Sequence, residues 1–418
     1  MNLSQGQLQR IKVIENAVKG RISVEEAAEL LGLSARQITR LKQQSQQELA
    51  DWVYHGNTGK APANRISEAV RNQVVELAKG SYKGFNDTHF WEKLKKQEGL
   101  QLSRQSVQRI LRKAGLSTPQ KRRPPKYHSR RERRAQEGTM LQTDGSTHDW
   151  LEGRGPRLTM LAFIDDATGK VPVAWLQEEP ENTAGYLRIT RQVVEQLGIP
   201  LSIYRDQHST FQRNDEHWSE QEQLAGSQAP TQLGRCWQEL GITSIPARSA
   251  QAKGRIERLW RTFQDRLVSE LRLAAASTLD QAKAVLQSFL PEYNEQFAKA
   301  ARQAGVAYRK LDARLDLDYI FALRYERVVN PDHTIAVGTG LRVQLPALAG
   351  HKGYAGKKVE VCEQPNGDVK IYLDRRLLHC QPAEPGTGPI RARDMRRHTG
   401  PRKKKPIKTY TFAGRTAI

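Results

Sequence analysis

Three acidic residues have the types and positions that metal-dependent chemistry on phosphates requires. Asp144 lies in LQTDGS and Asp206 in IYRDQHSTF, each at the end of a predicted strand, and Glu257 lies early in a predicted helix, in AKGRIERLW. Their spacings are 206 − 144 = 62 and 257 − 206 = 51 residues. A set of carboxylates suits hard, oxygen-preferring Mg²⁺ or Mn²⁺ rather than zinc. Two such ions, about 3.5–4 Å apart, can bracket an in-line phosphoryl displacement.

Each of these acids also has an ordinary structural alternative. An Asp in a loop at a strand end often caps a turn, and Glu257 can pair with Arg261 at i+4. Asp165 and Asp166 head a predicted turn and are left out of the set. It is the combination of the three acids with one strand order that favours catalysis.

The pattern from residue 139 onward supplies a fold that brings the acids together. Strands and helices are predicted to alternate there, with strands over 140–144, 158–165, 171–176, 201–205 and 242–245, and helices over 183–197, 232–240 and 254–273. Three antiparallel strands followed by alternating helices and strands are typical of a ribonuclease-H-like α/β domain. In that order the first and fourth strands are neighbours, so Asp144 and Asp206 are expected at adjacent strand ends, with Glu257 pointing at them from the last helix.

The charge of the chain points to nucleic acid. Its 418 residues include 67 Lys and Arg against 45 Asp and Glu, a net charge of +22. Such an excess favours a polyanionic partner, of which nucleic acid is the commonest; a merely soluble basic protein is the alternative. Mean hydropathy is −0.69, and no apolar run approaches about 18 residues, which argues against a membrane-spanning helix. The three scattered cysteines suit a reducing compartment, and the N-terminus has no signal-peptide pattern, so we expect a cytoplasmic protein.

Two segments before the core have the pattern of helix-turn-helix units, over 1–55 and 64–116. Ser23 and Glu26 form a predicted capping box, Gly32 and Ser34 mark a turn, and Ser103 is a predicted cap in the second unit. An ordinary helical hairpin is the alternative. The residues expected to read bases lie on the second helix of each unit: Arg36, Gln37 and Arg40, and Arg104, Gln105 and Gln108.

Two strongly basic segments are expected to lie along phosphates. The linker arm, predicted over 117–136, contains a stretch, 119–134, with eight Lys/Arg and one acid, a net 8 − 1 = +7. Residues 389–418 contain ten Lys/Arg and one acidic residue, a net charge of 10 − 1 = +9. The alternative for the arm is a solvated linker. The basic residues around Glu257 also have an alternative, which is an ordinary basic helix face. The predicted phosphate contacts are Lys121, Arg122, Arg123, Arg130 and Arg131 in the arm, and Lys253, Arg255 and Arg258 around Glu257.

The whole chain is therefore predicted to be a multidomain α/β protein. The catalytic core is expected over 137–275 and a helical connector over 276–325. Short strands with an Asn366-Gly367 turn predict a small β-barrel over 326–383. A basic tail over 384–418 is expected to be disordered without a partner.

Three segments carry a family resemblance: 128–151, 203–211 and 242–273. Through them the chain resembles bacterial insertion-sequence transposases of the ISNCY group, within the DDE transposase and retroviral-integrase superfamily. The resemblance implies that Asp144, Asp206 and Glu257 are the DDE triad with two Mg²⁺ or Mn²⁺ ions. It also implies a bacterial, nucleoid-associated protein whose partner is double-stranded DNA. The expected reaction is binding to terminal inverted repeats, strand cleavage to a 3′-OH, and transfer of that end into target DNA by a homodimer or higher multimer.

Two other functions fit parts of the sequence. A non-catalytic DNA-binding regulator descended from a transposase would keep the helix-turn-helix units and the arm, but has no reason to keep three converging acids. A ribonuclease-H-like nuclease that only hydrolyses has no need of two sequence-reading units.

Overall fold

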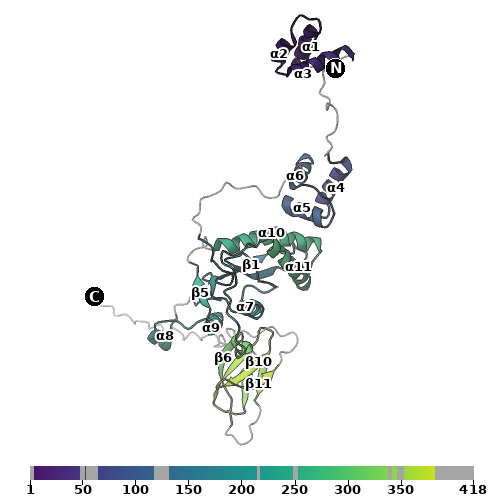
Figure 1. Cartoon of the computed structure of the whole chain (residues 1–418). Helices are drawn as coiled ribbons and strands as arrows, with labels where there is room; N and C mark the ends of the chain where they lie inside the picture. The colour runs from purple at the N-terminus through teal and green to yellow at the C-terminus, as the bar shows by residue number, and fades with distance from the viewer. Residues whose placement is uncertain are drawn as a thin grey trace, which may run out of the picture. The chain divides into compact units, whose positions relative to one another are not determined.

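The computed structural model describes residues 4–47, 52, 65–116, 131–213, 217–247, 253–337, 341–345 and 353–381 (Figure 1). The chain divides into two units, Met1–Gln73 and Val74–Ile418. Most of the predicted arm and all of the predicted tail lie outside the described residues. Within the ranges given, no helix is long and apolar enough to cross a bilayer.

The first unit contains three short helices around a small core. They are α1 (Gln5–Val18), α2 (Val24–Leu31) and α3 (Ala35–Gln47). The predicted capping box is present: the Ser23 hydroxyl accepts from the Glu26 N–H at 3.1 Å, and the Glu26 carboxylate accepts from the Ser23 N–H at 2.7 Å. Gly32 ends α2 with φ of 62°, a left-handed conformation that glycine adopts without steric cost.

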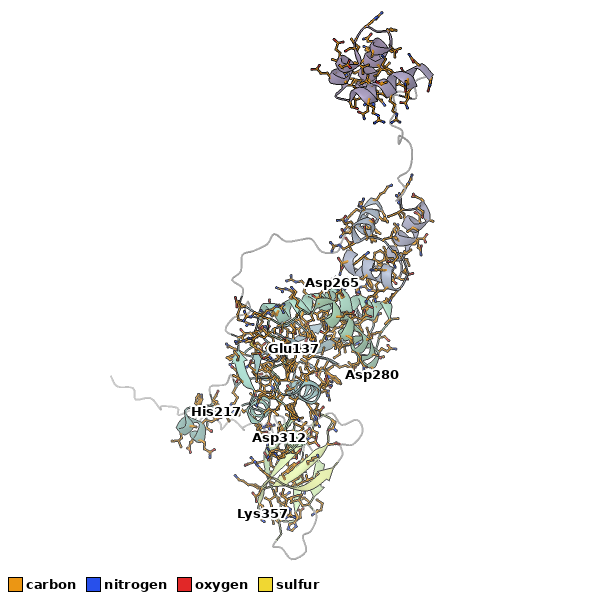
Figure 2. The ribbon with its side chains drawn as sticks, in the orientation of Figure 1. Glu137, His217, Asp265, Asp280, Asp312 and Lys357 are labelled. Carbon is orange, nitrogen blue, oxygen red and sulfur yellow. The ribbon has the colours of Figure 1, made fainter. Side chains whose placement is uncertain are left out.

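Helix α4 (Glu68–Lys79) runs from the first unit into the second, where α5 (Asp87–Lys96) and α6 (Arg104–Lys113) follow. The predicted cap of α6 is confirmed, because the Ser103 hydroxyl accepts from the Ser106 N–H at 3.1 Å. Polar contacts join α5 to α10 (Gly254–Leu273). Asn86 donates to Asp265, which Figure 2 labels, and Glu270 accepts from Lys93 at 2.7 Å.

The core is a mixed five-stranded sheet in the order β3-β2-β1-β4-β5. The first three strands are antiparallel, and β4 and β5 are parallel to β1. The antiparallel first three strands and the adjacency of the first and fourth strands agree with the prediction for a ribonuclease-H-like core. Its strands are β1 (Leu141–His148), β2 (Leu158–Asp165), β3 (Val173–Gln177), β4 (Ser202–Arg205) and β5 (Thr243–Pro246).

Helices cover both faces of this sheet (Figure 1). Helices α7 (Thr183–Leu197) and α9 (Gln232–Glu239) pack on one face, and the short α8 (Glu220–Ala225) precedes α9. Helix α10 and α11 (Leu279–Phe297) pack on the other, where Phe263 lies among the rings of Trp260, Phe289 and Tyr293. The apolar face of α10 therefore fixes the helix that carries Glu257 against the sheet.

The strands after the core do not form the predicted barrel within the described residues. One sheet has the order β11-β10-β9-β6, and β7 pairs only with β8. Side chains of both sheets share one apolar core, including Val337, Val343, Val361 and Ile371. The elements are α12 (Leu317–Ile320), β6 (Leu323–Val328), β7 (Thr334–Val337), β8 (Leu341–Gln344), β9 (Lys358–Glu363), β10 (Val369–Leu373) and β11 (Arg376–Gln381).

We expect Phe263→Ala to destabilise the core by about 3–5 kcal/mol, because the ring is fully buried and its removal leaves a cavity under α10. Equilibrium chemical denaturation followed by tryptophan fluorescence measures this. Leu224→Ala, at a side chain 89% exposed, is the control and should change stability by no more than about 0.5 kcal/mol. An equal midpoint for both variants would contradict the packing described for α10.

Candidate active site

Asp144 lies inside β1 rather than at its end, which corrects the sequence prediction. The strand continues to His148 because β2 pairs along its whole length. Asp144 is paired with Ala162, whose side chain belongs to the apolar core under α10, so the carboxylate faces α10. There the Trp260 ring N–H donates to Asp144 Oδ2 at 3.3 Å.

Asp206 directly follows β4, as predicted. The parallel register pairs Gln142 with Tyr204, so two residues further along each chain Asp144 and Asp206 come level. The His208 N–H donates to Asp206 Oδ1 at 2.9 Å, which fixes the carboxylate in the loop. The two carboxylates thus meet at one edge of the sheet.

One lysine lies between these two carboxylates. Lys253 Nζ donates to Asp144 Oδ1 at 2.8 Å and to Asp206 Oδ2 at 3.3 Å, and its side chain is only 11% exposed. Burial alone lowers the pKa of Lys253, but the hydrogen bond and charge of Asp144 and the charge of Asp206 outweigh it, so the pKa is raised. The lysine therefore stays charged and offsets one of the two negative charges of the pair.

Glu257 is on the same helix face but does not join the pair. Positions 253, 257 and 260 have i, i+4, i+7 spacing, so Glu257 lies between two residues that both bond to Asp144. Its side chain is exposed, and the predicted alternative, an ion pair with Arg261, does not form between these two described residues. Over the described ranges, no three or more His, Cys, Asp or Glu side chains are grouped closely enough to hold a metal ion.

A fourth carboxylate near the site, Glu181, was not identified from the sequence. It accepts from the Tyr186 hydroxyl at 2.6 Å and lies against Gly145, where an added Cβ would meet Glu181 Oε2 at 2.5 Å. Burial raises the pKa of Glu181; the Tyr186 hydrogen bond opposes this, and the charges of Asp144 and Asp206 add to it. Glu181 follows two other acids in EEPEN, a run that resembles an exposed loop, so no sequence signal distinguished it.

Among the described basic residues predicted to contact phosphates, three are engaged in ion pairs: Lys253, Arg131 and Arg255. Arg131 and Arg255 both bond to the buried carboxylate of Asp166. Arg258 is exposed. Four residues predicted to contact phosphates lie outside the described residues: Lys121, Arg122, Arg123 and Arg130.

The predicted base-reading residues lie on α3 and α6 as expected. Arg36, Arg40, Arg104 and Gln105 are exposed, and Gln108 is half-buried. Gln37 is exposed but engaged, because its Oε1 accepts from the Ser34 N–H at 3.2 Å and completes a cap at the start of α3. Its side-chain amide nitrogen is the group that remains to donate a hydrogen bond to a DNA base.

Comparison with solved structures gives low overall superposition. A simian T-cell lymphotropic virus intasome in complex with PP2A regulatory subunit B56 gamma is 13% identical, with a TM-score of 0.31 over 76% of this chain and 98% of that one. The HTLV-2 integrase catalytic core domain in complex with magnesium is 18% identical, with a TM-score of 0.26 over 37% and 88%. The description of the fold therefore rests on its own strand order.

Comparison of sequences is more informative. No family model matches the chain. The transposase for insertion sequence IS1202 of Streptococcus pneumoniae is 29% identical over 408 residues, covering 88% of this chain and 84% of that protein. The protein y4bF of Sinorhizobium fredii (strain NBRC 101917 / NGR234), which is named as a transposase, is 34% identical over 371 residues, or 88% and 79% of the two chains. With this identity along most of its length, the chain belongs to the insertion-sequence transposases.

Proposed function

We propose that this transposase is a DDE-type polynucleotidyl transferase with Asp144, Asp206 and Glu257 as its catalytic carboxylates. The observation that carries the proposal is the convergence of Asp144 and Asp206 on one cation, Lys253 Nζ, at the edge shared by β1 and β4. Helix α10 brings Glu257 to the same face as the two residues that contact Asp144. Its exposed side chain is free to turn toward the pair when a ligand arrives.

The donor set fits a hard divalent cation. Two carboxylates already share one positive charge there, and all the donors are oxygen atoms, which Mg²⁺ and Mn²⁺ prefer. We propose that Asp144, Asp206 and Glu257 hold two such ions. When bound, they supply activation of the attacking oxygen and stabilisation of the leaving oxygen.

The surrounding residues have positioning roles in this proposal. The Trp260 ring N–H and the His208 backbone N–H each fix one carboxylate oxygen, so the metal-facing oxygens are aimed before a metal ion binds. With metal ions held by these carboxylates, Lys253 would be released and available to a DNA phosphate. No covalent enzyme intermediate is required, because a 3′-OH of the DNA is the nucleophile in the transfer step.

The proposed substrate is DNA with the terminal inverted repeats of the element. Exposed side chains on α3 and α6 are proposed to read base edges in the major groove. Arg131, Arg133, Arg134 and Arg302 line an open cavity of about 550 Å³, and we propose that it receives backbone phosphates. Because two ends have to be joined to one target, we also propose a homodimer or higher multimer on DNA.

One reaction tests the proposal against its two rivals. The full chain is incubated with Mg²⁺, labelled candidate ends and a supercoiled plasmid, and any joints are sequenced. Joined ends support the transferase. Binding without cleavage would indicate a regulator, and cleavage without joints would indicate a hydrolytic nuclease.

We expect Asp144→Asn, Asp206→Asn and Glu257→Gln each to lower cleavage and joining by about 100-fold or more, because each removes a metal ligand and several kcal/mol of transition-state stabilisation. Binding to ends, measured by mobility shift, should change little. Asp280→Asn, at an exposed acid on α11 (Figure 2), is the control and should react normally. Near-normal joining by Glu257→Gln would exclude it from the triad.

Arg36→Ala and Arg104→Ala are expected to weaken binding to the specific end more than to random duplex DNA. A good base contact contributes about 1–3 kcal/mol of discrimination. Fluorescence anisotropy on both duplexes measures the difference, with Lys19→Ala, an exposed lysine after α1, as the control. Equal losses on the two duplexes would make these arginines phosphate contacts instead.

Lys253→Met should destabilise the protein in the presence of a chelator by about 1–3 kcal/mol, because two partly buried carboxylates lose their cation. Added Mg²⁺ should then raise the melting temperature of the variant more than that of the wild type, since the metal no longer displaces an ammonium group. Lys310→Met, at an exposed lysine, is the control. A variant with wild-type stability in chelator would show that Lys253 does not neutralise the pair.

A further inference from the structure

Asp166 is a fully buried carboxylate in the turn that follows β2. None of its surface is exposed. A charge taken out of water in this way is costly unless several partners compensate it. The partners of Asp166 come from three separate parts of the chain, and this distribution distinguishes it from an ordinary turn residue.

The first two sources of partners are the segment before β1 and β1 itself. Arg131 bonds to both carboxylate oxygens, and the Arg134 backbone N–H donates to Oδ2 at 2.8 Å. From β1, the Gln142 side-chain amide donates to Oδ1 at 2.7 Å. Gln142 is two residues before Asp144 on the same face of the strand.

The third source is the first turn of α10. Arg255 Nη1 lies 2.8 Å from Asp166 Oδ1, its Nη2 donates to the Arg131 carbonyl at 3.3 Å, and its side chain is only 16% exposed. Arg255 is two residues after Lys253 and two before Glu257. Helix α10 has no side-chain cap at its start, so this ion pair is a polar anchor for its first turn.

We propose that Asp166 is a positioning residue for the reaction: it fixes the first turn of α10, with Lys253 and Glu257, relative to the part of β1 that carries Asp144. The inference rests on the proposed function. Asp166 does not contact the reacting atoms, and it acts through Arg255 and Gln142. Loss of its charge should leave the arginine side chains unanchored and let Glu257 move away from the metal site.

Asp165 provides a matched control in the same turn. It is 1% exposed, and its partners are the Gly138 N–H at 2.9 Å and the Thr168 N–H and hydroxyl at 2.7 and 2.8 Å. These bonds hold the turn without reaching α10. Asp165→Asn therefore reports the cost of disturbing the turn, and Asp166→Asn adds the loss of the link to α10.

The test measures two quantities on the full chain: Mn²⁺ affinity by electron paramagnetic resonance without DNA, and the rate of cleavage of pre-bound ends. For Asp166→Asn we expect both to fall about 10–100-fold, as is usual when a residue that orients metal ligands is lost. Asp165→Asn should change both less. Arg255→Gln should give the same losses, and the double variant no further loss, because the two residues act as one unit.

Wild-type Mn²⁺ affinity and rate in Asp166→Asn would overturn the proposal, as would equal losses in Asp165→Asn or additive losses in the double variant. If Asp166→Asn does not fold, Gln142→Met and Arg255→Gln test the two links separately, and normal Mn²⁺ binding by both would overturn it. Failure of the wild type to cleave ends would refute the proposed function instead, and the Mn²⁺ titrations would still decide the role of Asp166.

Discussion

Parallel pairing of β1 with β4 brings Asp144 and Asp206 to one edge of the sheet, and two carboxylates this close repel each other unless a cation lies between them. In the structure that cation is the ammonium group of Lys253. The same two carboxylates therefore need a positive charge for the stability of the fold and are the proposed ligands of the metal ions. In the proposed function, a divalent metal ion would take the place of this internal cation.

Helix α10 connects this edge to the rest of the core. Its apolar face is buried in the aromatic cluster around Phe263. At its start, Lys253 bonds to both carboxylates, and Glu257 follows with an exposed side chain. Apolar packing fixes the helix axis but leaves rotation and sliding of the first turn less well determined. A directional ion pair such as that of Arg255 with Asp166 restricts these motions, so the two kinds of interaction complement each other.

The positive charge of the chain serves two different purposes. Arg131 and Arg255 compensate a buried carboxylate, whereas Arg36, Arg40 and Arg104 are exposed on helices and available to a polyanion. Composition alone treats all of these as equivalent contributions to a net charge of +22. Ion pairing separates them, because an arginine that already pairs with a buried carboxylate contributes less to the release of counterions from DNA.

The sequence by itself determined the features that depend on neighbouring residues. The caps at Ser23 and Ser103 follow from local patterns, and the strand order of the core follows from the order of elements along the chain. The candidate catalytic acids were chosen because carboxylates suit metal-dependent chemistry on phosphates. Only the tertiary structure decided which side chains meet. The bond from Lys253 to Asp144 joins residues that are 109 positions apart in the sequence. Glu181 is near the site because packing brings its carboxylate against Gly145. The length of β1 was likewise set by its pairing with β2. Such contacts depend on how whole elements pack, and no pattern within one turn or strand encodes them.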